Sequence, residues 1–479
     1  MQGAMKSRIG ICIGVLFLLI SSFIGYKAIK ISSDITELRH GISQGAAAEI
    51  LKGKTDKVAA DLRQMVAISG TPGLSSALGL AGLNVKSIQP EIQSLVGAAP
   101  LLLGADRPKR YLIAFQNSAE ARGTGGIIGA FAIVKFDRGK LSVERTGSNA
   151  ILKSLETLPI PMPSDFRRIY GDDPAIWQNS NISPHFPYGA KIWMALWEKQ
   201  FGEKLDGVIA VDPSALSYIL KSTGPIKLKS GEVITSKNLV SETLQKAYKR
   251  YEFDNLARKD FLVRIIDAAF SKIMAGQYSK IKLAQGLKSG IEENRILVFS
   301  SDTRVERWLE DTRIGGTLST TENNEFRAVI LNIDASKLDY YLSRKTQVKS
   351  LSCNKNGEIQ VELLVKNALK TGVGLPPYVL TRADKTKPAV LVSGQHRFLA
   401  FIYGPPGSTL ISAKRSSAFG SPGRLGEELH RPVLVVDVDL APQQSEKVTA
   451  VFSRGTGPIT YHSQPLVIAE KVAIDDKCR

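Results

Sequence analysis

The chain has 479 residues, of which 43% are hydrophobic and 23% are charged, and its formal net charge is +18. This balance is typical of folded globular protein and excludes extensive disorder, and the length allows two or three domains. The excess of 63 Lys and Arg over 45 Asp and Glu favours a polyanionic partner. Nucleic acid is not expected, because the sequence has no run of about five like charges and no helix-turn-helix signature.

An uncharged run covers residues 9–26, with basic residues on both sides. At about 1.5 Å per residue, a helix of this length comes close to the roughly 30 Å hydrocarbon core of a bilayer. A cleaved signal peptide is the alternative, but it usually has an apolar core of about 7–15 residues and a small-x-small cleavage site, which residues 27–30 do not offer. We therefore expect a cytoplasmic tail at 1–8, a single-pass signal anchor at 9–28 in the cell membrane, and an extracytoplasmic body. Only the N-terminal amine favours this orientation over the reverse.

Apolar residues recur at helical spacing after the span, which predicts a helical stalk over residues 29–105. Beyond Pro108 short strand patterns alternate with helical ones. We expect strands at 111–115, 127–136, 141–145 and 207–211, and helices around Trp193 and Trp197, from Asp212-Pro213 to 220, at 236–249 and at 255–274. This alternation predicts an α/β layered domain over residues 106–318.

From about residue 327 the sequence shows short strands separated by Gly, Pro and Asn turns, without a helical stripe. This pattern predicts a β-sandwich-like domain over residues 319–479. Its histidines share no spacing, so we expect an accessory domain without chemistry of its own. Cys12 falls inside the predicted span, which leaves Cys353 and Cys478 as the only possible outside pair, and nothing in the sequence shows that they meet.

The densest candidate for a site is the polar, glycine-rich stretch at 116–126, between two predicted strands. Backbone amides of its glycines beside a guanidinium could form an anion cradle. A tight glycine turn with a paired carboxylate and guanidinium on its surface explains the same residues equally well. The stretch fits neither a Walker A loop nor a Rossmann loop. The candidate ligand-binding residues here are Asn117, Glu120, Arg122, Gly123, Thr124, Gly125 and Gly126.

Catalytic residues are not identifiable, because the sequence has no Gly-x-Ser-x-Gly elbow and no His-Glu-x-x-His pair. The carboxylates Asp172, Asp173, Asp206 and Asp212 could hold a hydrated metal ion, but such residues are more often solvated or cap helices. We expect no metal and no cofactor.

The run from Tyr111 to Leu141, YLIAFQNSAEARGTGGIIGAFAIVKFDRGKL, resembles the core motif of the domain of unknown function 4012 family. The later segments DGVIAVDPSALSYILKSTGPI and SKLDYYL are similar to that family too. The resemblance covers nearly the whole chain after the anchor. It implies a membrane-anchored envelope protein of the kind found in actinobacteria and their relatives.

A fainter resemblance is to LytR-CpsA-Psr phosphotransferases, which transfer glycan polymers from polyprenyl phosphate carriers to the cell wall. It rests on the order of Arg122, the Arg138-Gly139 hairpin, the Tyr188-Gly189 helix, the strand and helix at 207–216, and a basic helix near Arg258. The resemblance implies a related fold, adds Arg258 to the ligand-binding residues, and implies Mg²⁺ or Mn²⁺ only if the transferase reaction is retained.

The chain departs from the transferase pattern at its acidic positions. Gly123 and Thr124 stand where those enzymes carry Ser-Asp, and the stretch Gly147-Ser148-Asn149 lacks their Arg and Asp. Phosphoryl transfer depends on neutralising pyrophosphate charge with arginines and a divalent ion. We therefore expect an envelope-biogenesis protein that binds an anionic lipid-linked or wall glycan without catalysis, and the phosphotransferase is the alternative.

Overall fold

The computed structural model describes residues 101–310, 312–321, 323–353, 357–372, 374–381, 393–417 and 423–478. The predicted tail, membrane span and all but the last five residues of the predicted stalk lie outside these ranges. Among the described residues, no helix combines the length and apolar character needed to cross a bilayer.

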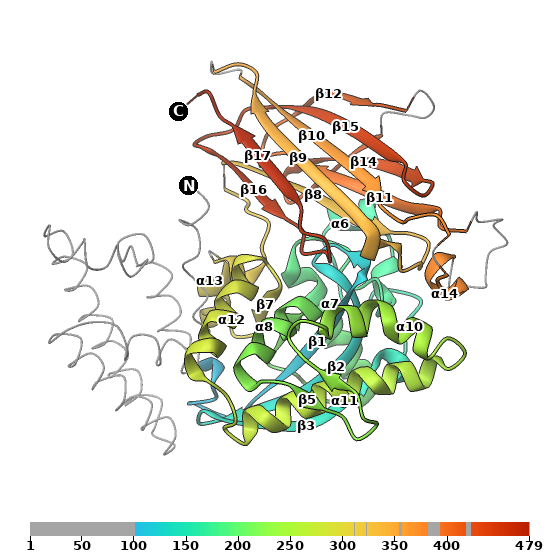
Figure 1. Ribbon diagram of the computed structural model, residues 1–479. Coiled ribbons are helices and arrows are strands. Elements are labelled where there is room, and N and C mark those ends of the chain that lie inside the picture. The colour runs from blue at the N-terminus through green and yellow to red at the C-terminus, as the bar shows by residue number, and fades with distance from the viewer. Residues whose placement is uncertain are drawn as a thin grey trace, which may run out of the picture.

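The first half of the described chain is built on a mixed five-stranded sheet (Figure 1). Its strands are β1 (Lys109–Arg122), β2 (Gly125–Asp137), β3 (Lys140–Ser148), β4 (Gly207–Val211) and β7 (Ile296–Ser300), in the order β3-β2-β1-β4-β7. The central strand β1 pairs antiparallel with β2 and parallel with β4. Strand β4 has the predicted bounds, whereas β7 was not expected from the sequence.

Alternate side chains of a strand point to opposite faces of the sheet. Because β1 is apolar on both faces, each face is covered by helices. Leu112 and Ala114 of β1 share a core with Trp193 and Trp197 of α7 (Phe186–Phe201). Tyr111 belongs to a second core with residues of the other helical layer. That layer contains α8 (Pro213–Thr223), α11 (Asn255–Met274) and α12 (Lys280–Glu292). The predicted mixed α/β architecture is therefore confirmed.

Local signals explain where these helices begin. The Asp212 side chain accepts a hydrogen bond from the Ala215 amide, and Pro213 occupies the first turn of α8, as the sequence predicted. The helix predicted at 236–249 is instead three consecutive segments, in which a π-helical turn separates two short α-helical pieces. These are α9 (Leu239–Ser241), η6 (Glu242–Lys246) and α10 (Ala247–Arg250).

Shorter elements complete this half. They are η4 (Asn149–Ile151), α6 (Ser164–Tyr170), η5 (Asp173–Ala175), β5 (Ile226–Lys227), β6 (Val233–Ile234), α13 (Thr303–Glu310) and η7 (Arg313–Gly315).

In the described part of the second half, two five-stranded sheets face each other across one apolar core (Figure 1). One sheet has the order β12-β15-β10-β9-β17 and the other the order β13-β14-β11-β8-β16. The strands are β8 (Asn324–Asn332), β9 (Leu342–Ser350), β10 (Glu358–Asn367), β11 (His396–Tyr403), β12 (Leu410–Arg415), β13 (Arg424–Glu428), β14 (Arg431–Leu440), β15 (Ser445–Ser453), β16 (Ile459–Ser463) and β17 (Lys471–Asp475), and the short helices are η8 (Leu338–Tyr341) and α14 (Pro377–Leu380).

The two halves share a core. Residues of β8, β11 and β14 pack on one side against the other sheet of the second half and on the opposite side against α7 and its neighbours. On β11, Phe398 lies in the inter-sheet core and Phe401 in the core shared with the first half. Strands buried on both faces have nearly continuous apolar sequences, as in the Val433 to Val436 run of β14.

Cys353 and Cys478 form a disulfide, with Cα atoms 5.3 Å apart and 125 residues between them in the sequence. The bond fastens the end of the chain, just after β17, to the segment that follows β9. The sequence left this pairing open, and the fold decides it.

Candidate functional site

The glycine-rich stretch at 116–126 is not an open loop. Strand β1 continues to Arg122, which pairs with Gly125 at the start of β2, so that only Gly123 and Thr124 form the turn. The side-chain oxygen of Gln116 accepts hydrogen bonds from the Gly126 amide and the Thr124 hydroxyl. This hairpin tip is buried between the two halves of the molecule.

The glycines at the tip are required by close packing. A Cβ on Gly126 would lie 2.0 Å from the carbonyl oxygen of Asn117, and one on Gly123 would lie 2.3 Å from that of Ile182. Gly125 has φ +140°, which side-chain-bearing residues rarely adopt. Of the two interpretations of this stretch, the tight turn accounts for these contacts.

Arg122 is held entirely by protein groups. Its guanidinium donates to the carbonyl oxygens of Gln178 (2.9 Å) and Asn332 (3.2 Å) and to the side-chain oxygen of Asn179 (2.9 Å). A hydrogen bond to the carbonyl oxygen of Ala121 (2.8 Å) and an ion pair with Glu120 at 3.4 Å complete the set. Burial lowers the pKa of Arg122. These contacts join β1 to both halves and give Arg122 a structural role, so its use in ligand binding has no support from the geometry.

Arg258, the remaining predicted ligand-binding residue, lies on α11 and not in the hairpin of β1 and β2. Its side chain stacks on aromatic rings. Its guanidinium carbon is 4.4 Å from the ring centre of Tyr248 on α10 and 5.5 Å from that of Tyr378 on α14. The two tyrosine rings stack on each other with centres 5.8 Å apart. The Asn117 amide donates to the Tyr248 hydroxyl at 2.8 Å, which links the cluster to β1.

Two further cations lie beside Arg258. Lys337 donates to Glu120 and lies 4.9 Å from the ring centre of Tyr378. Lys259 is half-buried, and no described residue forms a hydrogen bond or ion pair with it. Burial lowers the pKa of Lys259, and the charges of Arg258 and Lys337 lower it further.

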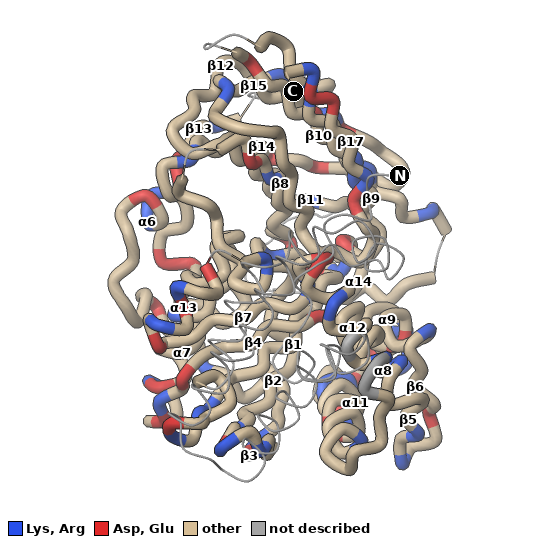
Figure 2. Tube along the Cα trace, turned by 90° about the vertical axis from the view of Figure 1, so that its left-hand side faces the viewer, with Lys and Arg blue, Asp and Glu red and all other residues tan. Residues whose placement is uncertain are grey.

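We call this group the cation–tyrosine cluster and define it by seven residues: Asn117, Glu120, Tyr248, Arg258, Lys259, Lys337 and Tyr378. Among the described residues, Glu120 is the one carboxylate within ion-pair distance of its cations, and Glu120 also pairs with Arg122. Figure 2 shows basic positions in blue on α11 and close to α14. Positive charge held together without matching carboxylates is destabilising unless an anion is bound, so the cluster is a candidate anion site.

Sequence reasoning found three of these seven residues and missed Tyr248, Lys259, Lys337 and Tyr378. Lys259 could have been found, because it adjoins Arg258 in the same basic helix. Lys337 lies in the SKLDYYL segment, but its position beside α11 depends on contacts between the two halves. Nothing local marks Tyr378.

Three of the four acidic candidates for a metal site, all except Asp173, have structural partners. Asp212 caps α8 and pairs with Arg295, and Asp206 accepts from the Arg110 amide at 2.8 Å and pairs with Arg107. Asp172 pairs with Arg167 at 3.4 Å. In the part of the chain that the structure describes, no three His, Cys, Asp or Glu residues are placed to hold a metal ion.

The histidines of the second half remain apart. His396 contacts Asp339 at 3.1 Å in a fully buried position, and His462 lies 3.8 Å from Glu325. Neither pair includes a second histidine within the described residues. His185, from the first half, lines the same cavity as His462.

The comparisons with known proteins agree with one resemblance seen in the sequence. Residues 106–248 match the model of a family described as "Protein of unknown function (DUF4012)". The matched region contains β1 to β4 and extends to Tyr248, so it includes three residues of the cation–tyrosine cluster. No curated protein and no solved structure matches the chain.

Proposed function

We propose that this protein is a membrane-anchored, extracytoplasmic protein of cell-envelope biogenesis whose cation–tyrosine cluster binds the phosphate of a lipid-linked or wall glycan without catalysis. The observation that carries the proposal is the convergence of Arg258, Lys259 and Lys337, of which only Lys337 has a carboxylate partner. Phosphate oxygens accept charge-assisted hydrogen bonds from such groups, and tyrosine rings add apolar faces with polar tips.

Two features support the location. The uncharged segment at 9–26 is long enough for a membrane anchor. Disulfides persist in oxidising compartments, and the Cys353–Cys478 bond is therefore expected of an extracytoplasmic body.

The alternative is a phosphotransferase similar to the LytR-CpsA-Psr enzymes, and Arg258 is the residue that favours it. Such a reaction needs a divalent ion beside the phosphates. The groups near the cluster do not fit this ion well, because Glu120 is already bonded to Lys337 and Arg122 and the neighbouring Asn117 carries an amide. The donor set therefore favours binding over transfer.

The test uses the full chain in detergent and measures binding of a polyprenyl-pyrophosphate glycan, with the matching polyprenol as the phosphate-free comparison. We expect Arg258→Gln and Lys259→Gln each to weaken binding roughly tenfold, as for loss of one charge-assisted hydrogen bond. Arg264→Gln is the matched control, because it removes the same charge from an exposed position on α11.

The two functions differ in the products. Glycan transfer in the presence of Mg²⁺ or Mn²⁺, lost in Arg258→Gln, would establish the phosphotransferase. Equal binding of the pyrophosphate and the polyprenol, or equal effects of all three substitutions, would refute the proposed phosphate site.

The anchor is tested separately. Chain recovered from membranes is expected to keep its N-terminal segment and to resist carbonate extraction. A mature chain that begins near Ala28 and is found in the medium would contradict the anchor.

A further inference from the structure

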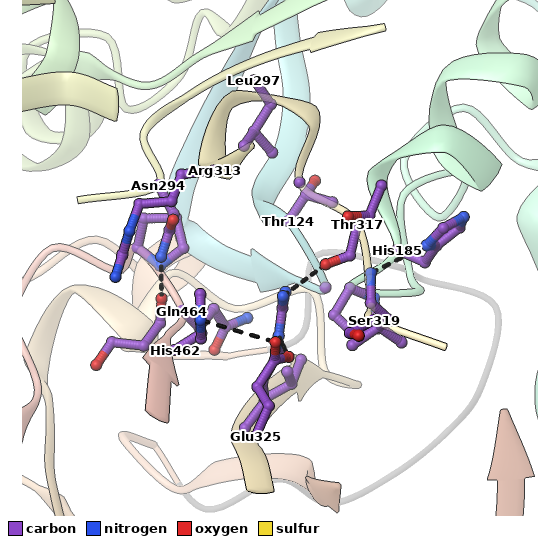
Figure 3. A pocket seen from close by; sticks show the side chains of 18 of the residues that line it. Thr124, His185, Asn294, Leu297, Arg313, Thr317, Ser319, Glu325, His462 and Gln464 are labelled. Carbon is purple, nitrogen blue, oxygen red and sulfur yellow. Dashed lines mark hydrogen bonds and ion pairs between the residues drawn. The ribbon is translucent and has the colours of Figure 1, made fainter. Parts of the chain in front are cut away.

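A cavity of about 590 Å³ lies between the two halves of the molecule and shares no lining residue with the cation–tyrosine cluster (Figure 3). The first half contributes the turn residues Gly123 and Thr124, together with His185 and Arg313. Residues 316–321, which connect the halves, form another wall. The second half contributes Glu325, Arg327 and His462, among others. Its volume lies within the range of about 300–1,000 Å³ that is usual for small-molecule sites.

Two guanidinium groups share one carboxylate at this cavity. Arg327 donates to Glu325 at 2.9 Å and to the carbonyl oxygen of Thr317 at 2.6 Å. Arg431, which is fully buried behind the wall, donates to the same Glu325 oxygen at 3.2 Å. One oxygen of Glu325 thus accepts from both arginines, and the nearby arginines outnumber this carboxylate.

Arg313 is the cation that remains available. Its hydrogen bond within the described residues goes to the carbonyl oxygen of Glu292 and is long, at 3.5 Å. No described carboxylate lies within ion-pair distance of it, although the exposed Glu310 also lines the cavity. Burial and the charge of Arg327 lower the pKa of Arg313. Figure 3 shows its side chain on the opposite wall from Glu325.

The histidines of the cavity are neutral hydrogen-bonding groups. Burial lowers the pKa of His185 to about 3, and burial together with neighbouring arginines lowers that of His462 to about 3. The Leu318 amide donates to Nδ1 of His185 at 3.1 Å, so the neutral ring carries its proton on Nε2. The connecting segment adds the hydroxyl groups of Thr320 and its neighbours.

We propose that this cavity binds a small, hydroxyl-rich oxyanion of the class of sugar phosphates and sugar carboxylates, with Arg313 as the principal anion contact. A guanidinium recognises carboxylate and phosphate through paired hydrogen bonds. Neutral imidazole, hydroxyl and amide groups match sugar hydroxyls. The ligand touches both halves and the segment that connects them, so its binding also stabilises their relative arrangement.

The test measures binding of glucose 1-phosphate, glucuronate, inorganic phosphate and glucose to the full chain in detergent by calorimetry. We expect glucose 1-phosphate or glucuronate to bind and glucose not to bind, and the preference between the two anions identifies the acidic group. Arg313→Gln is expected to weaken binding roughly ten- to hundredfold. Arg307→Gln on α13, which removes the same charge from an exposed residue outside this cavity, should leave binding unchanged.

Two further variants keep the outcome interpretable. If Arg313→Gln does not fold, Thr320→Glu places a negative charge at an exposed position of the cavity wall and should abolish binding of the anions. Arg258→Gln should retain binding, which separates this cavity from the cation–tyrosine cluster. The proposal is overturned if neither organic anion binds, if inorganic phosphate or glucose binds equally well, or if Arg258→Gln removes binding and Arg313→Gln does not.

Discussion

Gly126 closes the hairpin of β1 and β2 against Asn117. Because an added Cβ would lie 2.0 Å from a backbone carbonyl oxygen, the strands must separate to accommodate it. We expect Gly126→Ala to reduce the free energy of unfolding by about 1–3 kcal/mol, as other overpacked sites do. Gly374→Ala is the control, because nothing lies within 4 Å of its Cβ position. Denaturant titration of both variants measures the difference, and equal stabilities would show that the hairpin tip is less tightly packed than described.

Glu428 is a buried carboxyl group without a cationic partner among the described residues. It accepts hydrogen bonds from Ser183 (2.6 Å), Tyr170 (3.0 Å) and Tyr403 (2.7 Å) and thereby connects the two halves. Burial raises the pKa of Glu428, although these hydrogen bonds oppose the rise. Ionisation is therefore less favourable in the folded than in the unfolded chain.

The pH dependence follows from the sign of that shift. The contribution of Glu428 to stability is largest in acid and is lost as the pH rises through its raised folded-state pKa. We expect the stability of Glu428→Gln relative to the unmodified chain to increase from acidic to neutral pH, measured by urea unfolding at several pH values. A stability difference that does not change with pH would contradict this assignment.

At the scale of elements, we expect the edge strand β17 to depend on a covalent bond. It is an edge strand that pairs with β9 alone, and the Cys353–Cys478 disulfide follows it. Closing a long loop restricts the unfolded chain, and disulfides typically contribute about 2–4 kcal/mol. We expect Cys478→Ser to lower stability by about this amount and to speed amide hydrogen exchange in Lys471–Asp475 first.

A reductant provides the control for the disulfide. Dithiothreitol should destabilise the unmodified chain to the level of Cys478→Ser and leave that variant unchanged. Unaltered exchange in β17 after reduction would show that the strand is held by its ladder alone.

At the scale of the whole molecule, the two halves are expected to unfold together because they share a core. Phe398 and Phe401 lie on the same strand, in the inter-sheet core and in the shared core respectively. Replacing either with Ala should cost about 3–5 kcal/mol. Only Phe401→Ala should also increase hydrogen exchange in α7, which lies in the other half. Equal protection of α7 in both variants would indicate that the halves are energetically independent.

Local sequence patterns, such as hydrophobic period and capping residues, predicted the bounds of β4 and α11 correctly. The strand at 207–211 and the helix at 255–274 have the predicted bounds, and the cap at Asp212 lies where the sequence placed it. Failures occurred where tertiary contacts override local preference. The stretch at 116–126 contains the polar and glycine residues of a loop, yet partners from both halves hold it as strand.

The sequence by itself determined the alternation of strands and helices, the β-rich second half and the resemblance that the family match over residues 106–248 supports, because hydrophobic period, capping residues and motif spacing are local properties. It also named Arg258 as a candidate site residue. Only the tertiary structure decided that Arg122 is held by protein groups and that Lys259 and Lys337 lie beside Arg258. It also decided that Cys353 bonds to Cys478 and that a cavity opens beside Arg313. These outcomes depend on which groups from distant parts of the chain neutralise a charge or fill a space, and a single sequence does not encode those distances in any local pattern.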